Sequence, residues 1–506
     1  MTPTFGIVAV AVVSIATLAI GAYSWRFSRT TSDFFVASRT VRPALNASAI
    51  SGEYLSAASF LGIAGLVLTF GAEMLWYPVG WTAGYLLLLV LVAAPLRRSG
   101  AYTLPDFAEG RLESRTVRWF SSVLVVAIGW LYLMPQFQGA GLALGTVAGT
   151  DRWVGGAIVA LVVLVNVMLG GMRSITFVQA FQYWLKLTAL LVPVMFLLMV
   201  WAGDGAATSD AAGAGLTSDV WGSPLASSSD HAMYTTYSII VATFLGTMGL
   251  PHVVVRFYTN PDGRTARRTT LVVLVLLGIF YMLPPVYGAL GRLYAPDLIG
   301  SGHADTVVLE LPSRMIGGIG GDLLSALTTA GAFAAFLSTS SGLTIAVAGV
   351  LSQDVMGRTF RGVRSFQAAA VVAVVVPLLL ATLADGVSVA RAVGLAFAVA
   401  ASTFAPLLVL GIWWRRLTDA GALAGLLVGG GLSGLAVLDT LVGNVHTGWT
   451  GTLLAHPAAW TVPAAFATMV GVSLLTPRRL PVNVSRTMVR LHTPEAVELD
   501  RGPWPL

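Results

Sequence analysis

The sequence predicts an all-α polytopic membrane protein with about 13 transmembrane helices, ten of which form two inverted sets of five. Hydrophobic residues make up 56% of the 506-residue chain and charged residues only 10%, and the mean hydropathy is +0.80. Such a composition excludes a soluble globular domain. Apolar windows of about 20 residues, enough to cross a bilayer, recur along the chain. Two of these windows are interrupted midway by glycine, proline and small polar residues, and each one opens a set of five.

The apolar windows define the expected elements in chain order. The thirteen spans are expected near residues 4–25, 44–69, 74–96, 119–148, 153–171, 176–201, 234–257, 270–291, 321–350, 366–384, 388–413, 420–440 and 458–476. The corresponding division is an extra N-terminal helix (1–30), a first five-helix repeat (42–201), an extracellular loop (202–232), a second, inverted five-helix repeat (233–413), two C-terminal helices (420–476) and a cytoplasmic tail (477–506).

Arginines in the loops predict the orientation. The first span is not a cleaved signal peptide, because its amino end carries no positive charge while Arg26 and Arg29 follow it. Threading the chain with its N-terminus outside places most loop arginines and the C-terminus inside, as the positive-inside rule requires. An odd number of spans satisfies this asymmetry, and the two sets of five then start on opposite sides of the membrane. We expect a multi-pass protein of a bacterial cytoplasmic membrane, with a partly disordered tail.

Several functional classes are excluded by composition and motif. The chain has no cysteine, and its six histidines lack metal-ligand spacing, so no transition-metal site is expected. The net charge of +6 is accounted for by loop arginines, so nucleic acid is not an expected partner. The sequence contains no nucleophile elbow, no HExxH motif and no paired carboxylates, so an enzyme is not expected. Membrane lipid and a small-molecule substrate are the expected partners, and no obligate protein partner is evident. A coupling ion is expected, but no other cofactor.

The two interrupted spans indicate an ion-coupled transporter. The first contains Asn-Ala-Ser-Ala-Ile-Ser-Gly-Glu-Tyr-Leu-Ser over residues 46–56, and the second contains Thr-Phe-Leu-Gly-Thr-Met-Gly-Leu-Pro-His over residues 243–252. A helix broken in hydrocarbon leaves backbone groups unpaired at a cost of several kcal/mol each, tolerable only where they line a cavity or hold an ion. Matched breaks in two halves therefore predict a binding site at the midplane of the membrane.

A run of hydroxyls in the 321–350 span is a candidate cation site. Ser338 and Thr339 lie mid-span, and Ser340 and Ser341 follow them. Sodium is a hard cation that prefers oxygen ligands, which adjacent hydroxyls and the unwound backbone near residues 52–55 would supply together. The alternative is that these hydroxyls bond to their own helix backbone or serve as small packing residues.

Four polar residues at membrane depth are candidates for coupling or gating. Glu53 in the first break either attracts a cation, carries a coupling proton or accepts hydrogen bonds from freed amides, because an unpaired carboxylate there is costly. Lys186 is either a counter-charge for the substrate, a snorkelling side chain or half of an ion pair. His252 and Arg256, one helical turn apart, form a gate or a loop anchor; simple positive-inside placement also explains Arg256.

The interrupted spans and one amide supply the expected substrate cavity. Gln136 and Gln138 are amides that either bind a carboxylate or join helices. Half-helix amino ends can hold a carboxylate without a full counter-charge. The residues expected to line the substrate cavity are Ser51, Tyr54, Ser59, Gln136, Thr243, Phe244 and Thr247.

Several segments together resemble the sodium:solute symporter family, and more closely its acetate and monocarboxylate permease branch. They are Gly-Glu-Tyr-Leu-Ser-Ala-Ala-Ser-Phe-Leu-Gly-Ile from residue 52, Gly-Ala-Tyr-Thr-Leu-Pro-Asp-Phe from 100, Gly-Leu-Pro-His-Val-Val-Val-Arg-Phe from 249, Ala-Ala-Phe-Leu-Ser-Thr from 334 and Val-Gly-Leu-Ala-Phe-Ala-Val-Ala-Ala-Ser from 393. The Leu-Pro-His…Arg-Phe run is the most specific, and the likeness extends from about residue 33 to 414.

The resemblance implies a five-plus-five inverted-repeat transporter core and a sodium site between its first and eighth helices. The implied ligands are the backbone carbonyls of Gly52, Leu55 and Ala335 and the hydroxyls of Ser338 and Thr339. One departure is Gln179, which stands where many family members carry an aspartate near the cytoplasmic ion exit.

The expected function is therefore a secondary active symporter that imports a short monocarboxylate, such as acetate, propionate or pyruvate, by alternating access. Sodium is the favoured coupling ion. A proton-coupled carrier, a symporter for another small solute such as proline, and a membrane sensor built on a transporter-like domain are the alternatives.

Overall fold

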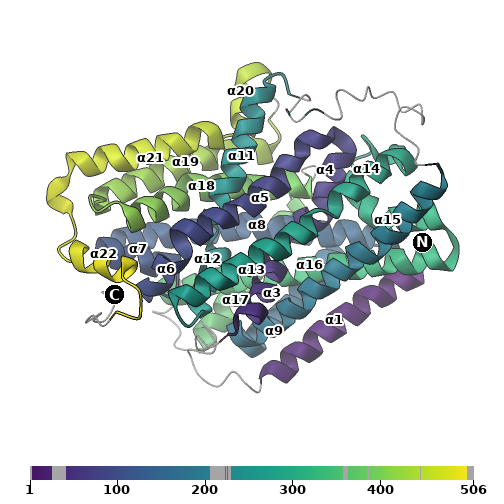
Figure 1. Ribbon diagram of the computed structural model, residues 1–506, viewed down its shortest axis with the longest axis horizontal. Helices are drawn as coiled ribbons and strands as arrows, with labels where there is room; N and C mark the ends of the chain where they lie inside the picture. Colours follow the sequence, from purple (N-terminus) through teal and green to yellow (C-terminus); the bar gives the residue numbers. More distant parts are fainter. Residues whose placement is uncertain are drawn as a thin grey trace.

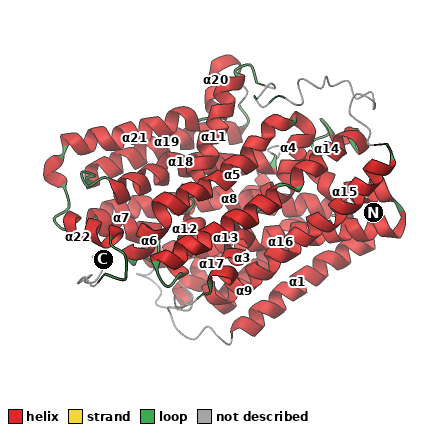
Figure 2. Cartoon of the chain, in the orientation of Figure 1, coloured by secondary structure: helices red, strands yellow, loops and turns green. Residues whose placement is uncertain are grey.

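The computed structural model describes residues 3–25, 41–205, 223, 225, 229–356, 363–383, 388–444 and 446–497. Within these ranges every regular element is a helix, as the sequence predicts (Figure 2). Arg26, Arg29 and most of the predicted extracellular loop lie outside the described residues, as do the last nine residues of the tail.

The long helices follow the apolar windows closely. The α-helices are α1 (Pro3–Trp25), α3 (Pro43–Tyr54), α4 (Ile63–Phe70), α5 (Trp76–Leu87), α6 (Ala93–Ser99), α7 (Leu104–Leu112), α8 (Arg115–Ala148), α9 (Arg152–Gly203), α11 (Ala232–Gly249), α12 (Pro251–Val255), α13 (Gly263–Tyr281), α14 (Pro284–Tyr294), α15 (Val307–Ile316), α16 (Gly318–Val350), α17 (Val363–Leu383), α18 (Val389–Trp413), α19 (Asp419–Val442), α20 (Gly448–Ala455), α21 (Ala458–Leu475) and α22 (Val484–His492). Short π or 3-10 turns extend several of them: η2 (Ala58–Gly62), η3 (Ala72–Leu75), η4 (Leu88–Val92), η5 (Arg256–Thr259), η6 (Pro296–Leu298), η7 (Ala304–Thr306), η8 (Leu351–Val355) and η9 (Pro477–Arg479).

The number of membrane crossings depends on how α9 is divided. Eleven helices of the described chain are long and apolar enough to cross a membrane, or twelve when the bent pair α3 and α4 with η2 is counted as one span. α9 is 52 residues long and contains a non-helical residue, Gly171, with φ 57° and ψ −162°. A single span needs only about 20 residues. Dividing α9 at Gly171 yields two spans and brings the total to the thirteen expected from the sequence.

Both predicted interruptions are present. In the first, α3 ends at Tyr54, and the chain bends by 71° before the helix resumes in η2 and α4. In the second, α11 ends at Gly249, and Leu250 adopts an extended conformation (φ −71°, ψ 121°) before Pro251 begins α12. Proline suits the first turn of the new helix because its missing N–H would have no partner there.

α16 lies at the centre of the molecule. All residues of its most apolar 18-residue window are buried, compared with 28% for α1 and 33% for α21. It packs most extensively against α9 and α8, and also contacts α1 and the broken helix α3. In Figure 1 these helices run roughly side by side, with α1 and α21 at the periphery. The hydroxyl run of α16 therefore lies against the first break, deep inside the protein.

The short connecting helices are features that the span prediction missed. α7 begins with a capping box: Thr103 accepts a hydrogen bond from Asp106 N at 3.2 Å, and the Asp106 carboxylate accepts one from Thr103 N at 3.0 Å. The span expected at 270–291 is present as one candidate membrane span, Gly263–Tyr294, and a break before Pro284 that was not expected separates α13 from α14 within it. The tail, expected to be partly disordered, forms α22, whose Leu491 is fully buried.

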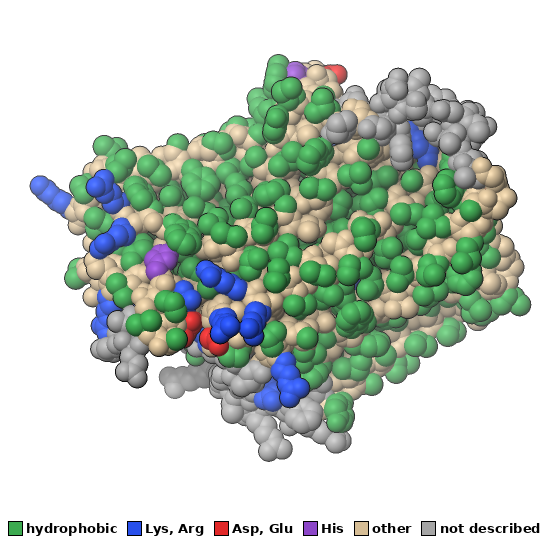
Figure 3. Space-filling model, viewed as in Figure 1, with side chains coloured by type: hydrophobic (Ala, Val, Ile, Leu, Met, Phe, Trp, Pro, Cys, Tyr) green, Lys and Arg blue, Asp and Glu red, His purple; other side chains and the backbone are tan. Residues whose placement is uncertain are grey.

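Arginine side chains gather at the end of the molecule that holds α6, the start of α13 and α22 (Figure 3). We call this the Arg-rich end; it includes Arg97 and Arg98 of α6 and Arg264, Arg267 and Arg268 of α13. α1 begins at the opposite end of the molecule from α22 (Figure 1). Counted from the start of α1 to α22, the number of crossings is therefore odd.

Candidate functional site

The five predicted cation ligands lie together, but a lysine stands among them. Lys186 of α9 is fully buried, and its Nζ donates hydrogen bonds to Gly52 O, to Leu55 O at 2.7 Å and to Ser338 Oγ at 2.8 Å. The two carbonyls are freed because α3 ends at the first break, where Leu55 leaves the helical conformation. Three of the five groups expected to bind sodium therefore hold the lysine ammonium.

The other two predicted ligands are occupied by hydrogen bonds within the same cluster. Ala335 O accepts a hydrogen bond from Ser338 Oγ at 3.1 Å, and Thr339 Oγ1 donates to the backbone oxygen of Glu53 at 2.6 Å. The hydroxyls of α16 thus join this helix to the broken helix α3. A sodium ion and the Lys186 ammonium cannot use the same three oxygens at once, so the arrangement observed does not fit a sodium ion at this point.

Glu53 and Arg256 form a buried ion pair beside this cluster. Arg256 Nε lies 2.5 Å from Glu53 Oε2, and the two side chains are only 1% and 3% exposed. Arg256 also donates to Thr176 Oγ1 at 3.1 Å and to Gln179 Oε1, while Gln179 Nε2 donates to Ser338 O at 2.8 Å. Four of the predicted coupling residues, Glu53, Gln179, Lys186 and Arg256, therefore belong to one network.

The chain makes room for Glu53 on the face of α16. A Cβ atom at Gly342 would overlap the Glu53 side chain. Glycine at this position lets the carboxylate of α3 lie directly on the central helix. Nothing in a hydropathy profile singles out Gly342 among the 55 glycines of the chain.

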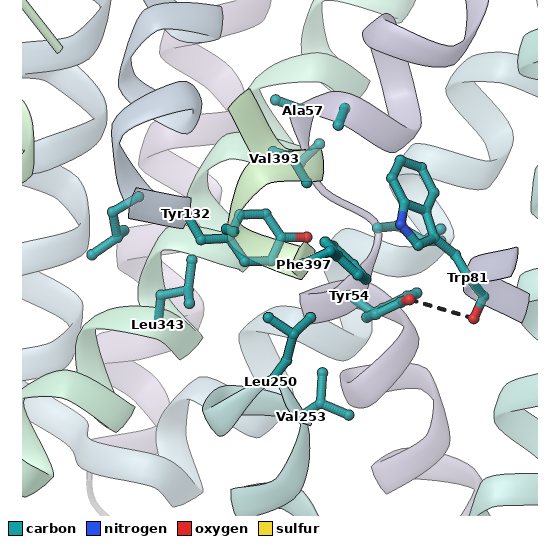
Figure 4. Packing of buried hydrophobic residues seen from close by; sticks show 14 of the residues in the cluster. Tyr54, Ala57, Trp81, Tyr132, Leu250, Val253, Leu343, Val393 and Phe397 are labelled. Atoms are coloured by element: carbon teal, nitrogen blue, oxygen red, sulfur yellow. Dashed lines mark hydrogen bonds between the residues drawn. The ribbon is translucent and has the colours of Figure 1, made fainter. Parts of the chain in front are cut away.

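An aromatic cluster lies next to the place where the Lys186 ammonium is bound, which we call the cation position. Both adjoin the first break. The cluster consists of Tyr54, Trp81, Tyr85, Tyr132 and Phe397. In Figure 4 the labelled rings gather around Phe397, which contacts Trp81 at 5.5 Å, Tyr132 at 5.8 Å and Tyr54 at 6.4 Å between ring centroids. These rings come from α3, α5, α8 and α18, so the cluster joins both halves of the chain.

Several polar atoms at this cluster have no hydrogen-bond partner within the described part of the chain. They are Trp81 Nε1, Tyr85 OH and both ring nitrogens of His252. His252 packs edge-on against Tyr132 at 5.2 Å, and its side chain is 1% exposed. Buried polar groups without partners are rare, and each one calls for an explanation such as a bound ligand.

The expected substrate residues differ in their hydrogen-bond partners. Ser51 is buried without a partner in the described chain, and Tyr54 OH bonds Thr247 Oγ1 at 2.7 Å and Trp81 O at 3.3 Å. Ser59 Oγ bonds Tyr281 OH at 2.9 Å. Gln136 has a structural partner: its Oε1 accepts a hydrogen bond from the freed amide of Ala57 at 3.0 Å.

The remaining two expected residues are less central. Thr243 donates to the backbone oxygen of Ile239 at 2.8 Å, within its own helix. Phe244 is only half-buried, and none of the ring contacts found among the described residues involves it. The sequence missed Trp81, Tyr85, Tyr132 and Phe397, because an aromatic residue inside an apolar window carries no signal of which face it occupies.

The centre is separated from both ends of the molecule. At the Arg-rich end, Asn46 of α3 donates to Thr259 Oγ1 at 3.1 Å and to Asn260 Oδ1 at 3.2 Å, which joins the two broken spans. At the other end, a cavity of about 750 Å³ is lined by residues that include Gln138, Arg152 and Asp305. None of the cation-position or aromatic-cluster residues lines this cavity.

Comparison with known proteins decides the family. The model of the sodium:solute symporter family matches residues 34–429, which is more than half of the chain. The chain belongs to the sodium:solute symporter family. The symporter is 31% identical over 469 residues to an uncharacterized symporter, YwcA, of Bacillus subtilis (strain 168), and the match covers 89% of this chain and 90% of that one. The family consists of transporters, not enzymes.

Solved structures show the same fold. A Na⁺-coupled sialic acid symporter, in its substrate-bound outward-open state, superposes with a TM-score of 0.69 at 16% identity, over 93% of this chain and 98% of the other. Mhp1, a nucleobase-cation-symport-1 family transporter in a closed conformation, gives 0.59 at 15% identity, over 91% and 99%. A manganese transporter of Eremococcus coleocola gives 0.54 at 13% identity, over 89% and 100%. The symporter therefore has the expected transporter core of two inverted five-helix repeats.

Proposed function

We propose that this symporter imports a short-chain monocarboxylate, such as acetate, propionate or pyruvate, together with a cation by alternating access. The observation that carries the proposal is the excess of buried positive charge around the first break. Arg256 is paired with the carboxylate of Glu53, whereas the Lys186 ammonium at the same break is bonded to two carbonyls and a hydroxyl and has no carboxylate partner among the described residues. Uncompensated charge at membrane depth is costly, and a bound anion offsets it.

The aromatic cluster suits the two parts of such a substrate. A carboxylate only accepts hydrogen bonds, and the Trp81 indole N–H and the Tyr85 hydroxyl are buried donors without partners in the described chain. The faces of Tyr54, Tyr132 and Phe397 offer an apolar surface for a short carbon chain. Ser51 and Thr247 complete the polar side of this proposed site.

Family membership and a Na⁺-coupled structural neighbour favour sodium as the cation, whereas the Lys186 ammonium on three of the five groups expected to bind sodium opposes it. The positive-inside rule favours the Arg-rich end as the cytoplasmic one, which sets the N-terminus outside and the C-terminus inside a bacterial inner membrane. The proposed repeats are residues 42–201 and 233–413, each opening with one of the two broken spans.

Uptake of labelled pyruvate, propionate and acetate into liposomes that contain the purified symporter tests the proposal. Pyruvate is the first choice, since it is the strongest of the three acids and its protonated form leaks least. Protein-free liposomes measure the leak. Exchange of labelled for unlabelled pyruvate without any ion gradient measures substrate passage separately from coupling.

The outcomes discriminate between the function classes. Exchange of at least one of the three acids above the leak supports the proposal. If proline exchanges and none of the three acids does, the substrate assignment is wrong. Tight binding of an acid without measurable exchange would instead support a membrane sensor with a transporter-like domain.

A further inference from the structure

We propose that the Lys186 ammonium replaces sodium at the cation position and that this symporter is driven by protons, which bind to and leave Lys186 Nζ. The inference concerns the coupling ion of the function proposed above, and it rests on that function only for its transport measurement. Lys186 makes three hydrogen bonds at the break of the first span.

The three partners of Lys186 match a charged ammonium. Gly52 O and Leu55 O are backbone carbonyls, which can only accept hydrogen bonds. Ser338 Oγ directs its own hydrogen toward Ala335 O at 3.1 Å, so it presents a lone pair to Lys186. Three acceptors therefore face one nitrogen. An ammonium has three N–H donors and satisfies all of them, whereas a neutral amine has two and leaves one acceptor unpaired.

This arrangement ties the protonation of Lys186 to the position of the broken helix. The lysine belongs to α9, its carbonyl partners end α3, and its hydroxyl partner belongs to α16. Loss of the proton removes one of the hydrogen bonds that hold the end of α3 between the other two helices. A freed buried carbonyl is costly, so the deprotonated site favours a different arrangement of the break.

The charges around Lys186 link the proton to the substrate. With Lys186 protonated, the cluster of Lys186, Arg256 and Glu53 carries one excess positive charge, which favours a carboxylate in the neighbouring aromatic cluster. With Lys186 neutral, Arg256 and Glu53 balance each other and the attraction is lost. One proton therefore enters with one monocarboxylate. No other bond is formed or broken, and no net charge crosses the membrane.

The other titratable groups around α9 are hydrogen-bonded, ion-paired or near helix ends. Lys186 is therefore the group expected to gain and lose a proton. Glu53 of α3 is paired with Arg256 of η5 at 2.5 Å. Tyr54 OH of α3 and Tyr287 OH of α14 are bonded to Thr247 and to Leu190 O. α1 carries no charged residue. On the other elements packed against α9, the charged residues lie near helix ends: Arg115 and Arg118 of α8, Arg292 of α14, Glu310 and Arg314 of α15, Asp322 of α16 and Arg364 of α17.

Nuclear magnetic resonance can observe the proton directly, because Lys186 is the only lysine of the chain. Protein grown on lysine labelled with ¹³C at the ε position gives one lysine resonance, whose chemical shift reports the protonation state of Nζ. We expect this resonance to respond to pH, to move toward the protonated form when pyruvate is added, and to ignore sodium. A resonance that responds neither to pH nor to pyruvate would overturn proton binding at Lys186.

Thermal unfolding with and without sodium tests the replacement independently of transport. Choline chloride at the same concentration serves as the ionic-strength control. We expect sodium to leave the unfolding midpoint of the wild type unchanged and to raise that of Lys186→Ala, since the variant keeps the oxygens of Gly52, Leu55 and Ser338 but loses the tethered cation. A sodium-dependent rise in the wild type would overturn the proposal.

Transport provides the third measurement. In liposomes we expect the wild type to concentrate pyruvate under an inward proton gradient, with no stimulation by a sodium gradient and no response to membrane potential. Lys186→Met should lose this accumulation and only equilibrate pyruvate. Gln182→Met, which removes a buried amide one turn earlier on α9 that bonds Thr17, is the matched control and should retain it.

The results separate this inference from the proposed function. Accumulation by the wild type that requires sodium and ignores the proton gradient contradicts the inference while leaving monocarboxylate import intact. If none of the acids exchanges, the proposed function fails, and the sodium response of unfolding and the resonance of Lys186 still decide the cation position. Folding failure of Lys186→Ala leaves the wild-type measurements decisive.

Discussion

At the scale of single residues, the centre of this symporter is held by charges and hydrogen bonds between segments far apart in the chain. Glu53 and Arg256 are separated by 203 positions, and both are nearly fully buried. A buried ion pair is itself weak evidence for stability, but removing one partner leaves an uncompensated charge. The pair should therefore act as a unit.

We expect Glu53→Gln and Arg256→Gln each to lower the free energy of unfolding by about 3 kcal/mol, the magnitude typical of a broken buried pair. The double variant should lose clearly less than the sum, since neither member of the pair is left without the other. Denaturant titration in detergent micelles measures all four proteins of this cycle. Strictly additive losses would show that the two side chains do not interact.

Trp81 allows a test of the substrate site that removes no hydrogen bond made by its side chain within the described chain. Its indole N–H has no partner within the described chain, so Trp81→Phe should not cost a protein hydrogen bond. Losing a donor to a charged carboxylate costs about 1.5 kcal/mol or more, so KM for pyruvate should rise about tenfold.

The matched control is Trp413→Phe, because the Trp413 indole donates to Leu91 O at 3.0 Å and is half-exposed. This variant loses a hydrogen bond but lies outside the aromatic cluster, and KM should stay within twofold of the wild type. Equal effects of the two substitutions would argue against a substrate at Trp81.

At the scale of elements, backbone geometry at single residues decides where spans begin and end. Gly171 divides α9 into two spans because its φ of 57° and ψ of −162° are open only to glycine. Hydrogen bonds at helix starts also shape the loops between spans. Examples are the capping box of α7 and the contact between Asp305 and the start of α18.

Gly171→Ala should destabilise the symporter by about 1–3 kcal/mol, the cost of forcing a side chain into such a conformation. Gly278→Ala on α13 is the control, since a Cβ there meets nothing within 4 Å and the residue is helical; it should be neutral or slightly stabilising. Thermal unfolding compares the stability of the two variants. Equal unfolding midpoints would contradict a special role for Gly171.

Asp305 makes one connection sensitive to pH. It lies in the turn before α15, accepts a hydrogen bond from Val389 N at 3.3 Å, and is buried, which raises its pKa to about 6. An unfolded aspartate has a pKa of about 3.9, so the folded state binds the proton more tightly. Protonated Asp305 therefore stabilises the folded state by about 3 kcal/mol below about pH 4. This stabilisation is lost as the pH rises through about 6.

Asp305→Asn should remove this pH dependence, because the amide keeps the acceptor oxygen and cannot ionise. Between pH 4.5 and 7.5 the wild-type unfolding midpoint should fall relative to that of the variant. Parallel curves for the two proteins would show that Asp305 ionises in the folded state as easily as in the unfolded one.

At the scale of the whole molecule, the structure is an enclosed state in which the centre is sealed toward the Arg-rich end. Asn260 accepts hydrogen bonds from Asn46 at 3.2 Å and from Thr269 at 2.9 Å, and so joins both broken spans to α13. Alternating access requires this seal to open, and weakening it should shift the population toward the open state.

We expect Asn260→Ala to raise the labelling rate of a cysteine introduced at Ser48 about fivefold when a membrane-impermeant maleimide is applied from the Arg-rich side. The hydrogen bond from Asn46 that crosses the seal contributes about 1 kcal/mol to the closed state, which corresponds to about fivefold in population. The chain has no native cysteine, so the reporter is unambiguous. Asn166→Ala, a buried asparagine of α9 outside the seal, is the control; equal labelling in both would contradict the role of Asn260.

Much of the architecture was predictable from the sequence because it depends on local properties. The apolar windows of α8, α16, α18, α19 and α21 and the breaks near Leu55 and Leu250 follow from hydropathy and from glycine, proline and small polar residues within single segments. The division of the 270–291 span at Pro284 was missed, since proline also occurs inside the continuous helices α8 and α18.

The sequence by itself determined that this protein is a membrane transporter with two broken spans, because crossing hydrocarbon and interrupting a helix are decided by the residues of one segment. The tertiary structure alone decided what occupies the cation position. Lys186 lies 131 positions from Leu55 and 152 from Ser338, and only the packing of α9 against α3 and α16 brings its ammonium to their oxygens. The partner of a buried charge is a property of packing, so no local pattern could have shown it.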